Sequence, residues 1–229
     1  MGKAGKKYKA SKERLEKSGP LLLDEAIILL KEIAFARFNE TVEFIISLGI
    51  DPRKSDQMVR GTVSLPHGTG KKIKVLAFCK PDQVSDALAS GADYAGSDDL
   101  VEKIKGGWLD FDVAVAEKSM MRDISKLGRI LGPRGLMPSP KAGTVTDNIP
   151  QAINEVKTGK IEFKANKYGD IQSAVGKISF SPEELKDNIL CLYQEIVRIR
   201  PAVVKGKYVK KASICASMSP SLEVDIASL

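Results

Sequence analysis

Residues 72–116, KIKVLAFCKPDQVSDALASGADYAGSDDLVEKIKGGWLDFDVAVA, decide the fold of the middle of this chain. Apolar, strand-like runs open and close the stretch, and helix-like runs lie between them: a strand at 72–78, helices at 81–92 and 98–107, and a strand at 111–116. Strands that alternate with helices are typical of a parallel sheet. The stretch therefore predicts a Rossmann-like α/β domain.

The two flanks of this stretch follow a different pattern. Residues 23–38 have helical apolar spacing, and strand-like runs follow at 41–50 and 60–65. Beyond a helix near Met120 and another at 148–159, residues 160–180 indicate a hairpin around the turn Tyr168–Asp170. Ser181 and Pro182 begin a helix, and strands are expected at 208–218 and 221–226. The flanks thus predict an α+β domain with antiparallel strands built from both chain ends.

The whole chain is therefore expected to be α/β with two domains. A split outer domain would comprise residues 1–66 and 160–229, and the inserted α/β domain residues 67–159. The chain would cross between them at 67–71 and 158–160, and two crossings of this kind would form a hinge.

Charge is concentrated in the predicted outer domain. The chain of 229 residues carries a net charge of +7. Residues 1–67 hold 12 basic and 9 acidic side chains, residues 68–159 hold 13 and 12, and residues 160–229 hold 11 and 8. A moderate basic excess suits a folded nucleic-acid binder, so the outer domain is the better candidate for the main surface.

Several classes of protein are disfavoured by the composition. The three cysteines are widely separated in apolar runs, which indicates reduced core thiols in a cytosolic protein rather than disulfides or a zinc site. The basic N-terminus lacks the apolar segment of a secretory signal, and no apolar run could span a bilayer. We interpret the first dozen residues as an arm that is disordered or ordered on RNA, with a plain soluble tail as the alternative.

One basic stretch in the middle domain carries no acidic residue. SKLGRILGPRGLMPSPKAGTV, residues 125–145, combines four glycines and three prolines with Lys126, Arg129, Arg134 and Lys141. Glycine allows backbone conformations that are closed to other residues, and proline fixes φ. We therefore expect a basic loop of defined conformation that binds a polyanion. The alternative is a solvated connection that happens to lack carboxylates.

Catalytic motifs are absent or incomplete. HGTGKK lacks the first glycine and the final Ser or Thr of a phosphate-binding P-loop, and the glycines at 128, 132 and 135 do not match a dinucleotide fingerprint. His67 could act as a base, but a polar residue at the domain crossing is the better interpretation. No cofactor or metal is predicted. An α/β enzyme that binds a small phosphorylated ligand stays open as the alternative function.

Long passages of the sequence resemble one family in the same order. They are residues 23–78, residues 91–116 with 125–146, and residues 160–180 with SMSPS at 217–221. These segments resemble the sequences of the bacterial large-subunit ribosomal protein L-one family, and the resemblance covers nearly the whole chain. The resemblance implies a structural constituent of the large ribosomal subunit and not an enzyme.

The resemblance also implies specific partners. It implies binding to large-subunit rRNA at the mobile stalk beside the tRNA exit site, help in the release of deacylated tRNA, and translational repression of the protein's own operon mRNA. The expected partners are therefore rRNA, that mRNA, exit-site tRNA and the ribosome, in the cytoplasm and without a membrane. We expect a monomer when the protein is free.

Site residues follow from the resemblance by position. In the family the outer domain makes the principal rRNA contacts, which here implies Arg37, Phe38, Thr41, Glu43, Asn166, Lys167, Gly169, Gln172, Ser217, Met218, Ser219, Pro220 and Ser221. Phe38 would pack on a base or ribose, although its helical spacing also fits a core aromatic. Glu43 would ordinarily be on the solvent side of an edge strand.

Two positions depart from the family. Ser219 stands where Gly is usual and Gln172 where His is common, so we expect tuned affinity. We expect only a secondary RNA contact from the basic cluster Lys126, Arg129, Arg134 and Lys141, because it belongs to the nearly neutral inserted domain.

Overall fold

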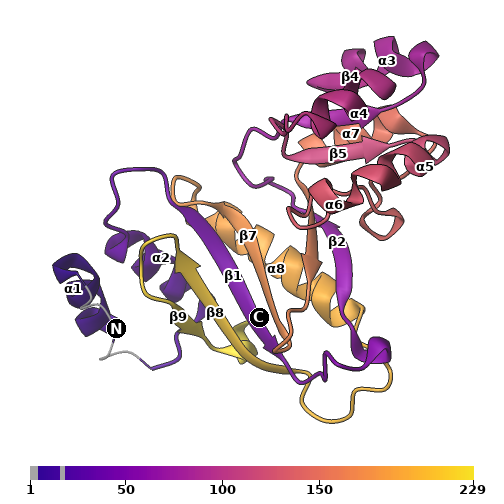
Figure 1. The fold of residues 1–229 in the computed structure, drawn as a ribbon. Helices are drawn as coiled ribbons and strands as arrows, with labels where there is room; N and C mark the ends of the chain where they lie inside the picture. The colour runs from indigo at the N-terminus through magenta and orange to yellow at the C-terminus, as the bar shows by residue number, and fades with distance from the viewer. Residues whose placement is uncertain (1–4, 16–18) are drawn as a thin grey trace. The chain divides into compact units, whose positions relative to one another are not determined.

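A computed structural model describes residues 5–15 and 19–229 (Figure 1). The chain forms two compact units. The outer unit joins the residues through Gly70 to Glu162–Leu229, and the inserted unit is Lys71–Ile161. The predicted α/β class with an antiparallel and a separate parallel sheet is confirmed.

The outer unit is built on a four-stranded antiparallel sheet in the order β7-β1-β8-β9. The strands are β1 (Thr41–Leu48), β7 (Asp170–Lys177), β8 (Val209–Ala216) and β9 (Leu222–Val224). Side chains of β1 alternate between buried and half-buried along its whole length, as expected of a sheet with one covered face. Helices α2 (Leu23–Ile33) and α8 (Pro182–Arg198) cover the buried face (Figure 1). The other face is open.

Helix α2 is shorter than the sequence predicts. It ends at Ile33, and Ala34 already has an extended backbone with ψ 122°. The expected helix to Phe38 is wrong because residues 34–40 have a competing set of hydrogen bonds, in which the Glu40 side chain accepts the Ala36 N–H. Phe38 consequently lies in a loop with 56% of its surface exposed, so it is not a core aromatic.

The predicted hairpin after Gly159 forms its turn but not its pairing. Asn166 Oδ1 accepts the backbone N–H groups of Tyr168 and Asp170, at 2.8 and 3.0 Å, and Gly169 takes a left-handed φ of 88°. However, β6 (Lys160–Lys164) pairs with β2 (Arg60–Ser64) in a sheet of two strands, while β7 pairs with β1. The turn was local and predictable, whereas the choice of partner strand was not.

The basic N-terminal segment contains a helix, α1 (Lys6–Leu15). Ser11 is buried, and its hydroxyl donates to the Ile33 carbonyl at the end of α2, at 3.2 Å. The prediction of a disordered arm is therefore wrong for residues 6–12. Residues 1–4 lie outside the described part of the chain.

The inserted unit has a parallel sheet in the order β4-β3-β5 with cores on both faces. Its strands are β3 (Val75–Phe78), β4 (Tyr94–Gly96) and β5 (Val113–Ala116), and its helices are α3 (Val84–Ala89), α4 (Asp98–Lys105), α5 (Met121–Ile124), α6 (Gly128–Leu131) and α7 (Ile149–Lys157). The sequence missed β4 because three residues are too short for a strand pattern.

The basic stretch at 125–145 is more regular than a loop. It contains α6 and two 3-10 turns, and Leu127 and Leu131 anchor it in the core of the inserted unit. Of its four glycines only Gly135 and Gly143 have a positive φ, at 70° and 66°. The expected conformational role of Gly128 and Gly132 is therefore wrong, since both have ordinary helical backbone angles.

The cysteines are free, but only Cys79 lies in a core; Cys191 and Cys215 are partly exposed. The expectation of three core thiols thus holds for one. Within residues 5–15 and 19–229, no helix has the length and apolar character needed to cross a bilayer.

Candidate nucleic-acid interface

Glu40 connects two loops that carry predicted site residues. It is 1% exposed, and its carboxylate accepts the Ala36 N–H at 3.0 Å and the Met218 N–H at 2.9 Å. The loop before β1 and the turn after β8 are thereby held at one end of the outer sheet. Phe38 and Met218 project from these loops with 56% and 51% of their surfaces exposed. The hydrogen bonds to Glu40 thus fix the backbone of the loops from which the exposed side chains of Phe38 and Met218 project.

Thr41 and Ser217 join the same two loops again. The Ser217 hydroxyl accepts the Thr41 N–H at 3.1 Å, and Lys177 Nζ donates to the Thr41 hydroxyl at 2.7 Å. Arg37 is exposed beside Phe38. We call this group the Met218 cluster, and its members are Arg37, Phe38, Thr41, Ser217 and Met218. It combines apolar faces with a cation and hydroxyls, which is the mixture that RNA recognition uses.

Glu43 and Gln172 meet on the open face of the sheet. Gln172 Nε2 donates to the Glu43 carboxylate across the β1 and β7 pair. β1 lies between β7 and β8, so the alternative interpretation of Glu43 as a residue of an edge strand is wrong. The amide supplies the donor that a carboxylate at an RNA surface needs. Cys215 and Ser213 continue this face on β8.

The turn after β8 accommodates the serine at 219 without strain. Ser219 has no positive φ, and its hydroxyl accepts the Ala216 N–H at 3.0 Å. A side chain at position 219, where the family usually has Gly, therefore meets no backbone strain. Pro220 is buried and shapes the turn, whereas Ser221 is exposed.

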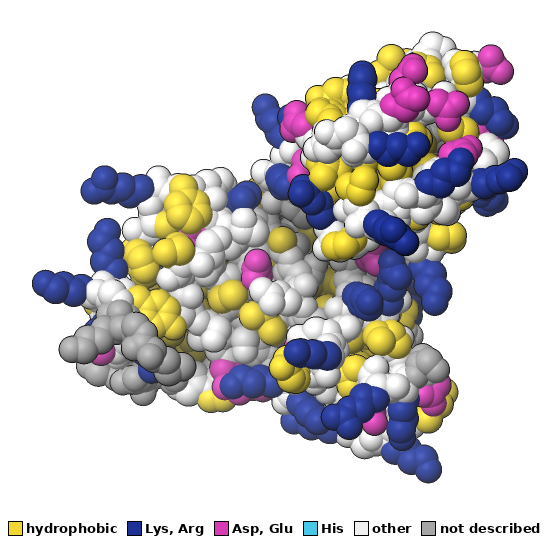
Figure 2. All heavy atoms as spheres, viewed as in Figure 1, with side chains coloured by type: hydrophobic (Ala, Val, Ile, Leu, Met, Phe, Trp, Pro, Cys, Tyr) yellow, Lys and Arg dark blue, Asp and Glu magenta, His cyan; other side chains and the backbone are white. Residues whose placement is uncertain are grey.

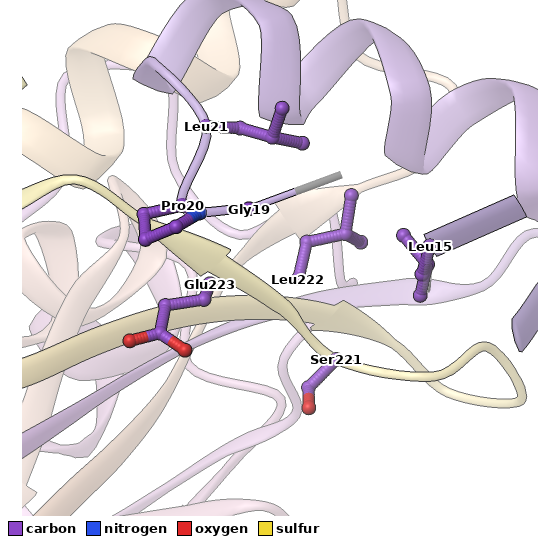
Figure 3. A pocket seen from close by; sticks show the side chains of 7 residues that line it. All are labelled: Leu15, Gly19, Pro20, Leu21, Ser221, Leu222 and Glu223. Carbon is purple, nitrogen blue, oxygen red and sulfur yellow. The ribbon is translucent and has the colours of Figure 1, made fainter. Parts of the chain in front are cut away.

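A hollow of about 190 Å³ lies beside Ser221 (Figure 3). Leu15, Leu21 and Leu222 form its apolar wall, and the Ser221 hydroxyl points away from them in Figure 3. Among the described residues of the lining, Glu223 carries the charge. An apolar wall with a carboxylate does not suit a phosphorylated ligand.

Asn166, Lys167 and Gly169 lie at the opposite end of the sheet. Gly169 O accepts the Leu48 N–H at 3.0 Å, at the far end of β1 from Thr41. Since β7 has eight residues, the turn is roughly 26 Å from the Met218 cluster at about 3.3 Å per residue. The structure therefore brings the predicted residues into two groups, with Glu43 and Gln172 between them.

The secondary basic residues belong to the inserted unit. Lys126 pairs with Asp123 at 2.7 Å, while Arg129, Arg134 and Lys141 are exposed and make no ion pair within the described residues. These three cations are free to meet an anion, but on a different unit from the Met218 cluster.

Three groups of titratable side chains are the ones that an α/β enzyme could use for chemistry. At the carboxyl end of the parallel sheet Lys80 pairs with the buried Glu117 at 2.7 Å, and this hydrogen bond lowers the pKa of Glu117. Burial raises the pKa of the Cys215 thiol, which keeps it protonated. His67 Nε2 lies 3.2 Å from Asp187 on the surface. Among residues 5–15 and 19–229 no three acidic, His or Cys side chains form a metal-binding group.

Sequence reasoning missed Glu40, although it lies inside the motif ARFNETVE. Its burial depends on Ala36 and on Met218, which is 178 residues away. An isolated acidic residue before a strand gives no signal of such a partner.

Known proteins resemble the chain along its full length. A sequence model of the ribosomal protein L1p/L10e family matches residues 30–220. The large ribosomal subunit protein uL1 of Protochlamydia amoebophila is 50% identical over 226 residues, covering 99% of this chain and 96% of that protein. Proteins of the same name from Kosmotoga olearia and Chlamydia trachomatis serovar L2b are 47% and 49% identical, over 98% and 100% of this chain and 97% and 99% of their own lengths.

Proposed function

Because the chain belongs to the ribosomal protein L1p/L10e family, we propose that it is a structural protein of the large ribosomal subunit and binds large-subunit rRNA through its outer unit. The observation that carries the rRNA site is the Glu40 carboxylate, which holds exposed Phe38 and Met218 on two loops at one end of the sheet. Such apolar faces stack on bases or riboses. Arg37, Lys167 and the hydroxyls would meet phosphate and ribose oxygens.

We further propose roles for the protein in translation and in its regulation. The protein would form the mobile stalk at the tRNA exit site, help deacylated tRNA to leave, and repress its own operon mRNA through a similar RNA structure. It would act in the cytoplasm and be a monomer when free of RNA. Family membership supports these roles.

Binding to an rRNA stalk fragment tests the rRNA site. Phe38→Ala and Met218→Ala should each weaken binding by roughly 1–3 kcal/mol, because each removes an apolar surface from contact with a nucleotide. Affinity is measured by titration of labelled RNA at several salt concentrations, and it should fall as salt rises.

A matched control removes exposed apolar side chains elsewhere on the outer unit. Ile28 and Val197 are 51% and 41% exposed on α2 and α8, and the double variant Ile28→Ala with Val197→Ala should bind as the parent does. A folded Phe38→Ala and Met218→Ala double variant with unchanged affinity would contradict the proposed site. A rise in melting temperature with nucleotides and not with RNA would favour an enzyme.

A further inference from the structure

The end of the outer sheet that is far from the Met218 cluster gathers cations from three segments. Leu48 N–H donates to Gly169 O, and Gly49 N–H donates to Tyr208 O at 2.6 Å, so the turns that follow β1, precede β7 and precede β8 lie together. Their exposed cations are Arg53, Lys54, Lys167, Lys205 and Lys207, and exposed Lys210 follows at the start of β8. Figure 2 shows Lys and Arg side chains gathered at this lower end of the outer unit.

None of these six cations takes part in an ion pair within residues 5–15 and 19–229. Other cations of the outer unit do, as Arg60 does with Glu162 and Lys211 with Glu223. The acidic side chains of the same turns are Asp51, Asp56 and Asp170. The Asp51 carboxylate already accepts the Arg53 N–H at 3.2 Å. The segments therefore hold an excess of positive charge that is available to phosphates.

Tyr168 lies at the tip of the turn before β7, beside Arg53 and Lys167 of this group. It is 72% exposed, and Lys167 Nζ lies 5.0 Å from the centre of its ring. Pro52, Arg53, Lys167 and Tyr168 line a hollow of about 330 Å³. The two hydrogen bonds that Asn166 Oδ1 accepts and the left-handed backbone of Gly169 fix the conformation of the turn. The ring is thus held outward at little further cost in entropy on binding.

We propose that an unpaired nucleotide of the bound RNA stacks on Tyr168 in this hollow, with its phosphates held by Arg53 and Lys167. An aromatic face among cations that have no ion pair is the arrangement used for single-stranded nucleic acid. The faces of a base inside a duplex are covered by the neighbouring stacked bases, so only an unpaired nucleotide can offer a face to the exposed Tyr168 ring. The inference rests on the proposed function and adds a base stacked on Tyr168, with Arg53 beside it, to the predicted contacts of Asn166, Lys167 and Gly169 at this end of the sheet.

The test uses the full chain and the rRNA stalk fragment. Tyr168→Ala should weaken binding about tenfold or more, the loss that removal of one base stack produces. Tyr168→Phe keeps the ring and should bind within about twofold of the parent. Arg53→Ala and Lys167→Ala should each reduce the slope of log affinity against log salt by about 1. Arg198→Ala, an exposed arginine on α8, is the matched control and should leave the slope unchanged.

The nucleotide itself is found by chemical protection of the RNA with parent protein and with Tyr168→Ala. Replacing the nucleotide that loses protection by an abasic residue should remove the penalty of Tyr168→Ala. If the Phe38 and Met218 variants lose affinity but Tyr168→Ala binds as the parent does, the base contact of Tyr168 is wrong while the proposed function stands. If the parent fails to bind the fragment even at low salt, the proposed function fails first.

Discussion

Glu40 shows how a single residue sets the geometry of the candidate interface. The two N–H groups it accepts belong to segments that share no strand, and a carboxylate can serve both because it has two acceptor oxygens. Replacing it by glutamine leaves one oxygen and turns an NH₂ group toward the second N–H.

Glu40→Gln should therefore lower the free energy of unfolding by about 1–3 kcal/mol and weaken rRNA binding by a similar amount. Urea titration measures the first quantity and RNA titration the second. Glu32→Gln, on the exposed side of α2, is the matched control and should change neither. Equal RNA affinity in the two variants would show that RNA binding does not need the two hydrogen bonds that Glu40 accepts.

At the scale of elements, α8 illustrates both a predictable and an unpredictable contact. Its capping box was predictable, since Ser181 accepts the Glu184 N–H and the Glu184 side chain accepts the Ser181 N–H. Asn188, in the middle of the helix, is fully buried. Its amide donates to Gly68 O and Val175 O, at 2.9 and 2.7 Å, and its oxygen accepts the His67 N–H at 3.1 Å.

Asn188→Ala leaves two carbonyls and one N–H without partners inside the outer unit. The free energy of unfolding should fall by about 3 kcal/mol, measured by thermal or chemical denaturation. Gln194→Ala, at an exposed position of the same helix, should cost less than about 0.5 kcal/mol. If Asn188→Ala lowered the free energy of unfolding by as little as Gln194→Ala, water would be able to replace the hydrogen bonds of the Asn188 side chain.

At the scale of the whole molecule, most of the net positive charge and the proposed RNA site belong to the outer unit. The inserted unit is nearly neutral, yet Arg129 and Arg134 are exposed and unpaired within the described chain. If the outer unit makes the principal contacts, these two arginines should matter little for a stalk fragment.

Arg129→Ala with Arg134→Ala should therefore leave the affinity for the rRNA fragment within about threefold of the parent, a difference below 1 kcal/mol. Arg37→Ala with Lys167→Ala removes the same amount of charge from the outer unit, and it should reduce the salt slope by about 2. The comparison is made by titration over a range of salt. A larger loss from the first pair would transfer the principal site to the inserted unit.

The sequence by itself determined whatever depends on neighbouring residues: the α/β class, the capped start of α8, the turn at Gly169 and the words that identify the family. Tertiary structure decided which strand β6 joins, where α2 ends, and how Glu40 connects Phe38 to Met218. It also brought Arg53, from the turn after β1, beside Lys167 and Tyr168. Local patterns report backbone preference and periodicity, whereas these contacts join residues up to 178 positions apart and form only when the sheet brings its turns together.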